Sequence, residues 1–398
     1  MKTIFSLNIL LLSVFLVISG NVSANDAVAM PEGAPSTGEV AASSLQEAPE
    51  TTSLFSGTTF SGYMNAGFLT NTRGAHWNGN ASTGSRSGGG LQGAYISAVK
   101  KAETCKAGGD WGFGTDFMFG EDSRICRVYN GFDESWWTGR NGRGSPWYGF
   151  AMPQLYTEFA VQHWTVQLGH FYTPLGYEPV PASGRFFFST GLSYDSLPAT
   201  HTGGQLKYDG IENFEASVGW VNGNDEGFSD VTGGSLVLGF FKYKFSDKMS
   251  LAYGFTAGDY SDQVNNTLPY QVYGSTHTWV LETSLNPCLD LATTADWQKR
   301  DGDLNSTTTT FGQYVYRRLN DHWRVGVRAE WQRFDYLDAG DNELINVTLG
   351  ANWAPTGDEK VFRIRPEIRY DSNTADPYGR RANKPDQVCF GGDMIYQF

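Results

Sequence analysis

Cationic side chains and cysteine are scarce in this chain of 398 residues. Lysine and arginine number 29 against 42 acidic residues, so the formal net charge is −13. Binding to nucleic acid needs a basic surface, and this composition excludes that class. The four cysteines are too few for a disulfide scaffold, and their spacing is not that of a zinc site. The six histidines form no HxxxH or HxH cluster and no nucleotide-binding loop is present, so we expect no metal and no cofactor.

Long apolar runs are also missing beyond the N-terminus. Residues Ile4–Ile18 form an apolar stretch that follows Lys2 and is broken only by Ser and Asn. Val22-Ser23-Ala24 resembles a small-residue cleavage site, so the pattern predicts a signal peptide over residues 1–24. No later segment reaches about 18 consecutive apolar residues, which excludes a transmembrane helix in the mature chain. An exported chain of this kind is either periplasmic or secreted, or it is an outer-membrane barrel.

Aromatic residues and glycine are abundant instead. Aromatics make up 15% of the chain and there are 48 glycines, yet the mean hydropathy is only −0.36. A membrane barrel has this composition because each strand turns one face to lipid and the other to water. Residues 25–55 are rich in Ala, Pro, Ser, Thr and Glu and predict a flexible periplasmic leader. Residues 56–398 predict the barrel.

Apolar and polar residues alternate most clearly in the last third of the chain. In residues 323–331, Trp and Val alternate with Arg, Gly and Glu, and in residues 361–370 Arg363, Arg365 and Arg369 share one face. An arginine on the lipid face costs roughly 2–4 kcal/mol near the midplane. A register slip of one residue in the strand at residues 361–370 would turn these three arginines toward lipid. The register is therefore well determined, with the arginines inside.

The alternation continues through about sixteen strands. They are centred near residues 63, 95, 115, 157, 167, 205, 217, 240, 253, 280, 294, 313, 328, 348, 366 and 393. Short links, such as Gln162-His163 and Asp209-Gly210, follow even-numbered strands, and the longer links follow odd-numbered ones. This rhythm is typical of an all-β, antiparallel, up-and-down transmembrane barrel. A soluble sandwich also alternates, but it would not combine a signal peptide with outward aromatics and inward arginines.

The chain ends on the aromatic residues Tyr396 and Phe398. They share the lipid-facing parity of Val388, Phe390 and Met394. An aromatic-x-aromatic end resembles the signal that the barrel-assembly machinery recognises in outer-membrane proteins. Together with the signal peptide and the strand rhythm, it strengthens the prediction of an outer-membrane location.

The longest central connection, from Tyr172 to Thr200, follows the fifth strand and contains four prolines. A loop this long inside a compact protein is usually functional. In sixteen-stranded porins the loop at this place folds into the lumen and sets the constriction, so we expect the same here. Glu178, Arg185 and Asp195 are the predicted constriction residues. The alternative is that these are solvated loop charges and that Phe186–Phe188 only packs the loop against the wall.

Charged residues on the inward faces of the strands are the other candidates. Arg324, Arg328, Arg363, Arg365 and Arg369 form a predicted pore-lining basic band, and the predicted pore-lining acids are Asp116, Glu158, Glu215, Asp290, Asp296 and Asp393. Opposed charges across a narrow throat would create a transverse field that orients solutes and biases ion passage. The alternative is that the arginines simply pair with Glu330 and Glu367 on their own wall.

Several blocks of the sequence resemble a β-barrel porin family described as OmpL-like, which is well represented in planctomycete-type bacteria. The matching blocks are Pro153-Gln154-Leu155-Tyr156, residues 168–178 (LGHFYTPLGYE), Arg185-Phe186-Phe187-Phe188, His201-Thr202-Gly203, residues 349–355 (LGANWAP) and residues 365–371 (RPEIRYD). They extend over nearly the whole mature chain. The resemblance implies an outer-membrane porin-like barrel with no well-established substrate. Two departures, Arg185 where such members often have Asn and the run Ser189–Tyr194, lie in the predicted constriction loop and put a shared solute preference in doubt.

Three functions are compatible with these features. The first is an outer-membrane porin that allows passive diffusion of small hydrophilic solutes or ions through a water-filled barrel. The second is a plugged structural or adhesive barrel that acts through its external loops. The third is a barrel enzyme, such as a lipase, but no Ser, His and acid set has convincing parity, so we expect no enzyme. The expected partners are outer-membrane lipid, small hydrophilic solutes and the barrel-assembly machinery, and the sequence leaves open whether the barrel is monomeric or a homotrimer.

Overall fold

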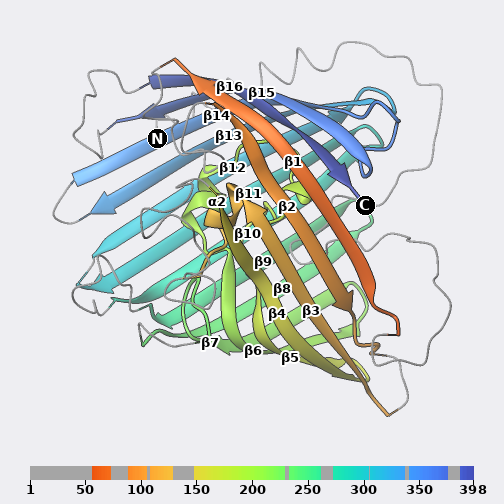
Figure 1. Cartoon of the computed structure of the whole chain (residues 1–398). Helices are drawn as coiled ribbons and strands as arrows, with labels where there is room; N and C mark the ends of the chain where they lie inside the picture. Colours follow the sequence, from red (N-terminus) through yellow and green to blue (C-terminus); the bar gives the residue numbers. More distant parts are fainter. Residues whose placement is uncertain are drawn as a thin grey trace. The chain divides into compact units, whose positions relative to one another are not determined.

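The computed structural model describes residues 56–72, 88–104, 108–128, 148–228, 233–260, 272–303, 305–336, 340–374 and 386–398. The predicted signal peptide and leader lie outside these residues, as does Cys105. Within the described residues the chain forms one closed antiparallel barrel of sixteen strands, in which every strand pairs with its sequence neighbours and β1 pairs with β16 (Figure 1). The predicted antiparallel barrel of about sixteen strands is confirmed, and each of the sixteen predicted centres falls inside an observed strand.

The strands are 8 to 15 residues long. They are β1 (Thr59–Asn71), β2 (Gly88–Lys100), β3 (Asp110–Gly120), β4 (Gly149–Val161), β5 (Trp164–Tyr172), β6 (Thr200–Ile211), β7 (Phe214–Val221), β8 (Ser235–Ser246), β9 (Met249–Asp259), β10 (Val272–Asn286), β11 (Leu289–Gly302), β12 (Ser306–Arg318), β13 (Trp323–Tyr336), β14 (Gly340–Trp353), β15 (Phe362–Asn373) and β16 (Asp386–Gln397). The described residues also contain three short helical turns: η1 (Asp122–Arg124), η3 (Ala182–Gly184) and α2 (Leu192–Ser196). No helix in the described part of the chain is long and apolar enough to cross a membrane.

The two faces of each strand differ in burial as the alternation predicts. On β15, Arg363, Arg365 and Arg369 are almost fully buried, whereas Ile368 and Tyr370 are exposed. Apolar side chains with more than a third of their surface exposed recur around the barrel, for example Leu168, Trp220 and Leu349. An exposed apolar exterior around a buried polar interior is the inverse of a soluble protein, and it fits a barrel surrounded by lipid.

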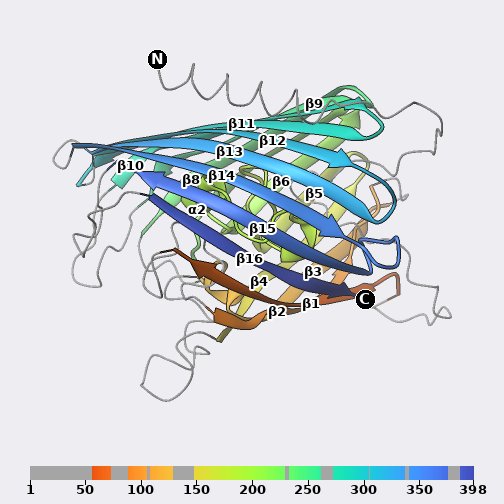
Figure 2. The same ribbon diagram turned by 90° about the horizontal axis from the view of Figure 1, so that it is seen from above.

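The link between β6 and β7 differs from the prediction. The strands are joined at Glu212 and Asn213, not at Asp209-Gly210, because a bulge between Tyr208 and Ile211 lets β6 continue past those residues. Asn213 takes a positive φ of 63° there, a conformation that asparagine tolerates better than most residues. The turn after β4 is at Gln162 and His163 as predicted. Figure 2 shows the same barrel turned by 90°, with β13 to β16 side by side.

Candidate functional site

The connection between β5 and β6, residues 173–199, contains η3 and α2 and is called the central segment below. Most of its residues from Leu175 to Ala199 are buried, although no long helix or strand organises them. A buried irregular backbone must find hydrogen-bond partners for its N–H and C=O groups. Many partners of the central segment are side chains on the inner faces of strands distant from β5 and β6 in the barrel.

Four arginines donate hydrogen bonds to main-chain carbonyls of the central segment. Arg365 Nη1 reaches the carbonyls of Ala182, Arg185 and Phe187 at 3.1, 2.7 and 3.0 Å. Arg369 Nη1 donates to Thr190 O at 2.6 Å. These bonds are charge-assisted and therefore stronger than bonds between neutral groups.

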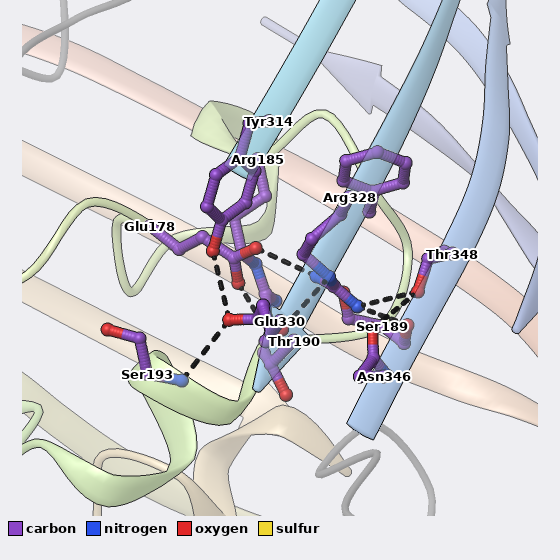
Figure 3. A network of polar contacts seen from close by, with 12 residues as sticks. Glu178, Arg185, Ser189, Thr190, Ser193, Tyr314, Arg328, Glu330, Asn346 and Thr348 are labelled. Carbon is purple, nitrogen blue, oxygen red and sulfur yellow. Dashed lines mark hydrogen bonds and ion pairs between the residues drawn. The ribbon is translucent and has the colours of Figure 1, made fainter. Parts of the chain in front are cut away.

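The other two arginines bind the same stretch. Arg363 Nη2 donates to the carbonyls of Ser183 and Arg185, at 2.5 and 3.2 Å. Arg328 Nη1 donates to Ser189 O at 2.8 Å, and its Nη2 donates to Ser189 Oγ at 3.1 Å (Figure 3). Together the four arginines form a row on β13 and β15 that holds the central segment by its backbone.

Three carboxylates accept hydrogen bonds from the N–H groups of the same stretch. Glu330 on β13 accepts from Leu192 N at 2.9 Å and Ser193 N at 3.3 Å, as well as from Tyr314 Oη (Figure 3). Glu367 on β15 accepts from Ser189 N at 3.1 Å. Glu178, which belongs to the central segment itself, accepts from Gly191 N at 2.9 Å and pairs with Arg328 at 2.8 Å. The wall formed by β13 and β15 thus satisfies both carbonyl and N–H groups of the segment.

The predicted constriction residues have different surroundings. Glu178 is held by Arg328, and Arg185 is buried with its Nη2 3.3 Å from Asp122 Oδ2 in η1. Burial raises the pKa of Asp122 to about 6, although the Arg185 guanidinium opposes the rise. Asp195 is exposed and accepts a hydrogen bond from Thr190 Oγ1 at 2.8 Å.

The central segment covers four of the five arginines of the predicted basic band. Arg328, Arg365 and Arg369 are at most 1% exposed, so they lie against the segment and do not face an open channel. Arg363 is 7% exposed and is also covered. Only Arg324 keeps a partly exposed side chain, which pairs with Glu359 at 2.7 Å and lies 5.6 Å from the ring of Phe186.

Three predicted acids lie deep inside the barrel. Asp393 forms a two-bond pair with Arg365, at 2.8 and 2.7 Å. Asp116 accepts hydrogen bonds from the Tyr95 hydroxyl and from Gln154 Nε2. Asp296 on β11 is 1% exposed and lies beside Ser193 of α2. All three are on the inner face.

The remaining three predicted acids lie closer to the turns that join even-numbered strands to the next strand. Glu158 is half-buried and accepts from Ala102 N at 2.8 Å. Glu215 is about half exposed, 3.9 Å from Lys244. Asp290 accepts from Ser284 Oγ at 2.6 Å. The six predicted acids therefore do not form one ring, and only part of the set contacts the central segment.

The sequence does not predict some of the side chains that hold the segment, and it indicates others only as alternative partners of the arginines. Glu330 and Glu367 were considered as partners of the arginines, and Arg328 does lie 3.4 Å from Glu330, but both acids also bind main-chain N–H groups. Asp122 carries no signal in the sequence, and Tyr63, whose hydroxyl accepts from Ala182 N at 3.1 Å, carries only a weak one. The inward parity of Tyr63 on β1 is the only pattern that could have indicated it.

The opposite wall contacts the central segment mainly through apolar side chains. Leu175 packs in a buried cluster with Phe171, Val221, Leu236, Leu238, Tyr260 and Val272. Tyr177 packs against a second cluster made by Phe240, Ala252 and Val280. Among the described residues no group of three His, Cys, Asp or Glu side chains is arranged to hold a metal ion.

Comparison with known proteins agrees with this geometry. The family model described as "Putative beta-barrel porin-2, OmpL-like" matches residues 57–398. No curated protein is similar enough to count as a relative. Among solved structures, a loop-deletion mutant of OmpT, an outer-membrane protein of Vibrio cholerae, has a TM-score of 0.57 at 14% identity, with 86% of this chain and 99% of that chain covered.

Two further channels have the same fold. The anion-selective porin from Comamonas acidovorans gives a TM-score of 0.55 at 12% identity, with 86% and 99% of the two chains covered. The outer-membrane channel DcaP of Acinetobacter baumannii gives 0.56 at 11% identity, with 86% and 97% covered. The family match covers 342 residues, 57 to 398, and the sixteen-stranded barrel agrees with it. The chain therefore belongs to the OmpL-like β-barrel porin family and is an outer-membrane porin.

Proposed function

We propose that the barrel is a diffusion channel for small hydrophilic solutes or ions and that the central segment narrows its lumen. The row of hydrogen bonds from Arg328, Arg363, Arg365 and Arg369 carries this proposal. These arginines stand on the inner faces of β13 and β15, whereas the segment begins at β5 and ends at β6. A chain that leaves one wall and binds the inner face of another has to cross the interior.

Partly exposed charges near the even-to-odd turns support a water-filled entrance below the segment. Arg324 and Glu359 retain 23% and 29% of their side-chain exposure, and Glu282 retains 24% beside Lys242. Charged inner faces of this kind attract water and ions in a pore, whereas a lipid-filled or fully packed interior would exclude them. We infer no catalytic activity, since the charged groups are used in holding the segment.

The plugged, adhesive barrel remains the second candidate because one observation favours it. Arg328, Arg365 and Arg369 are almost completely buried by the central segment, whose contacts reach both the β13–β15 wall and the β7–β10 wall. A segment that fills the whole cross-section would stop conduction. The external loops would then carry the function.

Conductance in a planar bilayer distinguishes the two candidates. Full-length mature protein is purified from outer membranes or refolded in detergent and added to one side of the bilayer. We expect stable conductance steps that scale with salt concentration. A correctly folded barrel that gives no steps would exclude the channel and favour the plugged barrel.

We also propose that Tyr396 and Phe398 form the signal for the barrel-assembly machinery and that the barrel works as a homotrimer. Both aromatic rings are at least half exposed on the outer face, and Phe398 closes the barrel through two backbone hydrogen bonds with Gly62. OmpT of Vibrio cholerae, which shares the fold, has been described in a trimer form. Loss of the folded barrel in cells on Phe398→Ala, with refolding of the same variant in detergent retained, would support the assembly signal.

A further inference from the structure

The arginines that contact the central segment are almost all matched by carboxylates. Arg365 pairs with Asp393 at 2.7 Å, Arg369 with Asp371 at 2.8 Å and Arg185 with Asp122 at 3.3 Å. Arg328 lies between two acids, Glu178 and Glu330, at 2.8 and 3.4 Å. The predicted basic band therefore contributes little net positive charge to the interior.

The excess charge at this level of the barrel is negative. Arg363 is the one arginine of the row that has carbonyls and no side-chain carboxylate within bonding distance in the described chain. Four buried carboxyl groups have no arginine of their own to balance them: Asp116, Asp296, Glu367 and the second acid beside Arg328. Acids therefore outnumber bases around the segment.

Asp296 is the most exceptional of these acids. Its carboxylate is 1% exposed, and the Ser193 hydroxyl is the side-chain donor beside it in the described part of the chain. On the inner face it lies between Thr278 and Thr310 of the adjacent strands, with Ser193 of α2 and Glu330 on β13, a second buried acid, close by. Two residues further along the same inner face, Gln298 donates from Nε2 to Ser196 O at 3.0 Å, so this part of β11 lies directly against α2.

A carboxylate in these surroundings attracts cations strongly. Burial removes the water that would screen its charge, and neutral hydroxyl groups such as that of Ser193 replace that water without neutralising the charge. The nearby charge of Glu330 adds to the negative potential, while the arginine closest to Glu330 is already shared with Glu178. A water-excluded site of one sign raises the local concentration of counter-ions.

We propose that the channel is selective for cations and that Asp296, which is covered and therefore acts through its electric field and not by contact with the ion, is the specificity-determining residue. This inference rests on the proposed channel function and names its substrate class: small inorganic cations and cationic hydrophilic solutes. The potential at the edge of α2 is negative, so a cation that passes the central segment gains stabilisation where an anion is repelled. The fold itself imposes no sign, since the anion-selective porin from Comamonas acidovorans shares it.

The test is a reversal-potential measurement with KCl at different low concentrations on the two sides of a planar bilayer. The measurement is made at pH 8. We expect the unaltered channel to prefer K⁺ over Cl⁻ by on the order of tenfold, the lower end of what a charged cleft does to counter-ion concentration. Asp296→Asn, which keeps the side-chain shape, should bring the preference most of the way toward equal permeability.

The matched control is Asp290→Asn on the same strand and face. Asp290 is half-buried near the end of β11 and already accepts a hydrogen bond from Ser284, so its removal should change the preference far less. An anion-selective or non-selective unaltered channel would overturn the inference even if Asp296→Asn failed to fold. Equal selectivity in Asp296→Asn and the unaltered channel would also overturn it. Absence of any conductance would instead overturn the channel function itself, so the two failures are distinguishable.

Discussion

The two walls that hold the central segment use different chemistry. The β13–β15 wall binds main-chain atoms through charged side chains, such as Arg365 to three carbonyls and Glu330 to two N–H groups. The β7–β10 wall binds side chains, chiefly Leu175 and Tyr177, through apolar packing. Charge-assisted bonds fix direction and register, whereas packing fixes volume. We therefore expect substitutions in the β13–β15 wall to misplace the segment and substitutions in the β7–β10 wall to loosen its packing.

Loss of Arg365 should have the largest effect. Arg365→Ala removes three bonds to carbonyls of the central segment and leaves the Asp393 carboxylate buried at 4% exposure without its cation. Breaking one partner of a buried pair costs roughly 3–5 kcal/mol. We expect a lower urea midpoint in lipid vesicles, followed by tryptophan fluorescence, and a larger and noisier conductance in a bilayer.

The control for Arg365→Ala is Arg333→Ala on β13. Arg333 is about 40% exposed and pairs with Asp335 and Asp341 at the surface, where an ion pair contributes little. The urea midpoint of this variant should stay within error of the unaltered protein. Equal losses in the two variants would contradict the role of the arginine row in holding the segment.

On the apolar wall, Leu175→Ala should give the next largest effect. Leu175 is 3% exposed in its cluster, and removal of a buried leucine costs roughly 2–5 kcal/mol, depending on how far the site collapses. The expected result is a lower urea midpoint with the K⁺ over Cl⁻ preference unchanged, because no charge near Asp296 is altered. A large shift of ion preference in Leu175→Ala would show that the two walls are not independent.

The sequence predicts the wall of this barrel better than its interior. Strand number, register and the inward parity of Arg363 and Arg365 follow from a period of two and from the cost of an arginine in lipid, both of which are local. The limits of the central segment are also local, since it begins and ends where the alternation does. One strand end was misplaced, because a bulge near Tyr208 is not encoded by alternation.

The contacts of the central segment depend on its path, which no periodic pattern records. Arg185 and Asp122 are 63 residues apart, and Arg365 binds Ala182 across 183 residues. Parity places each arginine inside the barrel but does not tell whether it meets water or a folded segment. For the same reason the sequence favoured an open basic band, whereas Arg328, Arg365 and Arg369 are covered.

The smallest effect should come from the contact between the segment and η1. Burial holds the pKa of Asp122 at about 6, above its ordinary 3.8, so the folded state binds the proton more tightly than the unfolded state. Stability from this group is therefore fully present below pH 3.8 and is lost as the pH rises through 6. Lowering the pH from 7 to 5 should raise the free energy of unfolding by on the order of 1 kcal/mol through Asp122.

The measurement compares urea midpoints at pH 5 and pH 7 for the unaltered protein and for Asp122→Asn. The asparagine cannot titrate, so the variant should lack the Asp122 part of the difference, while the other carboxylates contribute equally to both proteins. An identical pH dependence in the two proteins would contradict a buried, proton-binding Asp122. Arg185 pairs with Asp122 only while that carboxyl is charged, so the same titration also tests a third contact that holds the segment. The expected gain at pH 5 means that burial of the charged carboxylate costs more than its attraction to Arg185 returns.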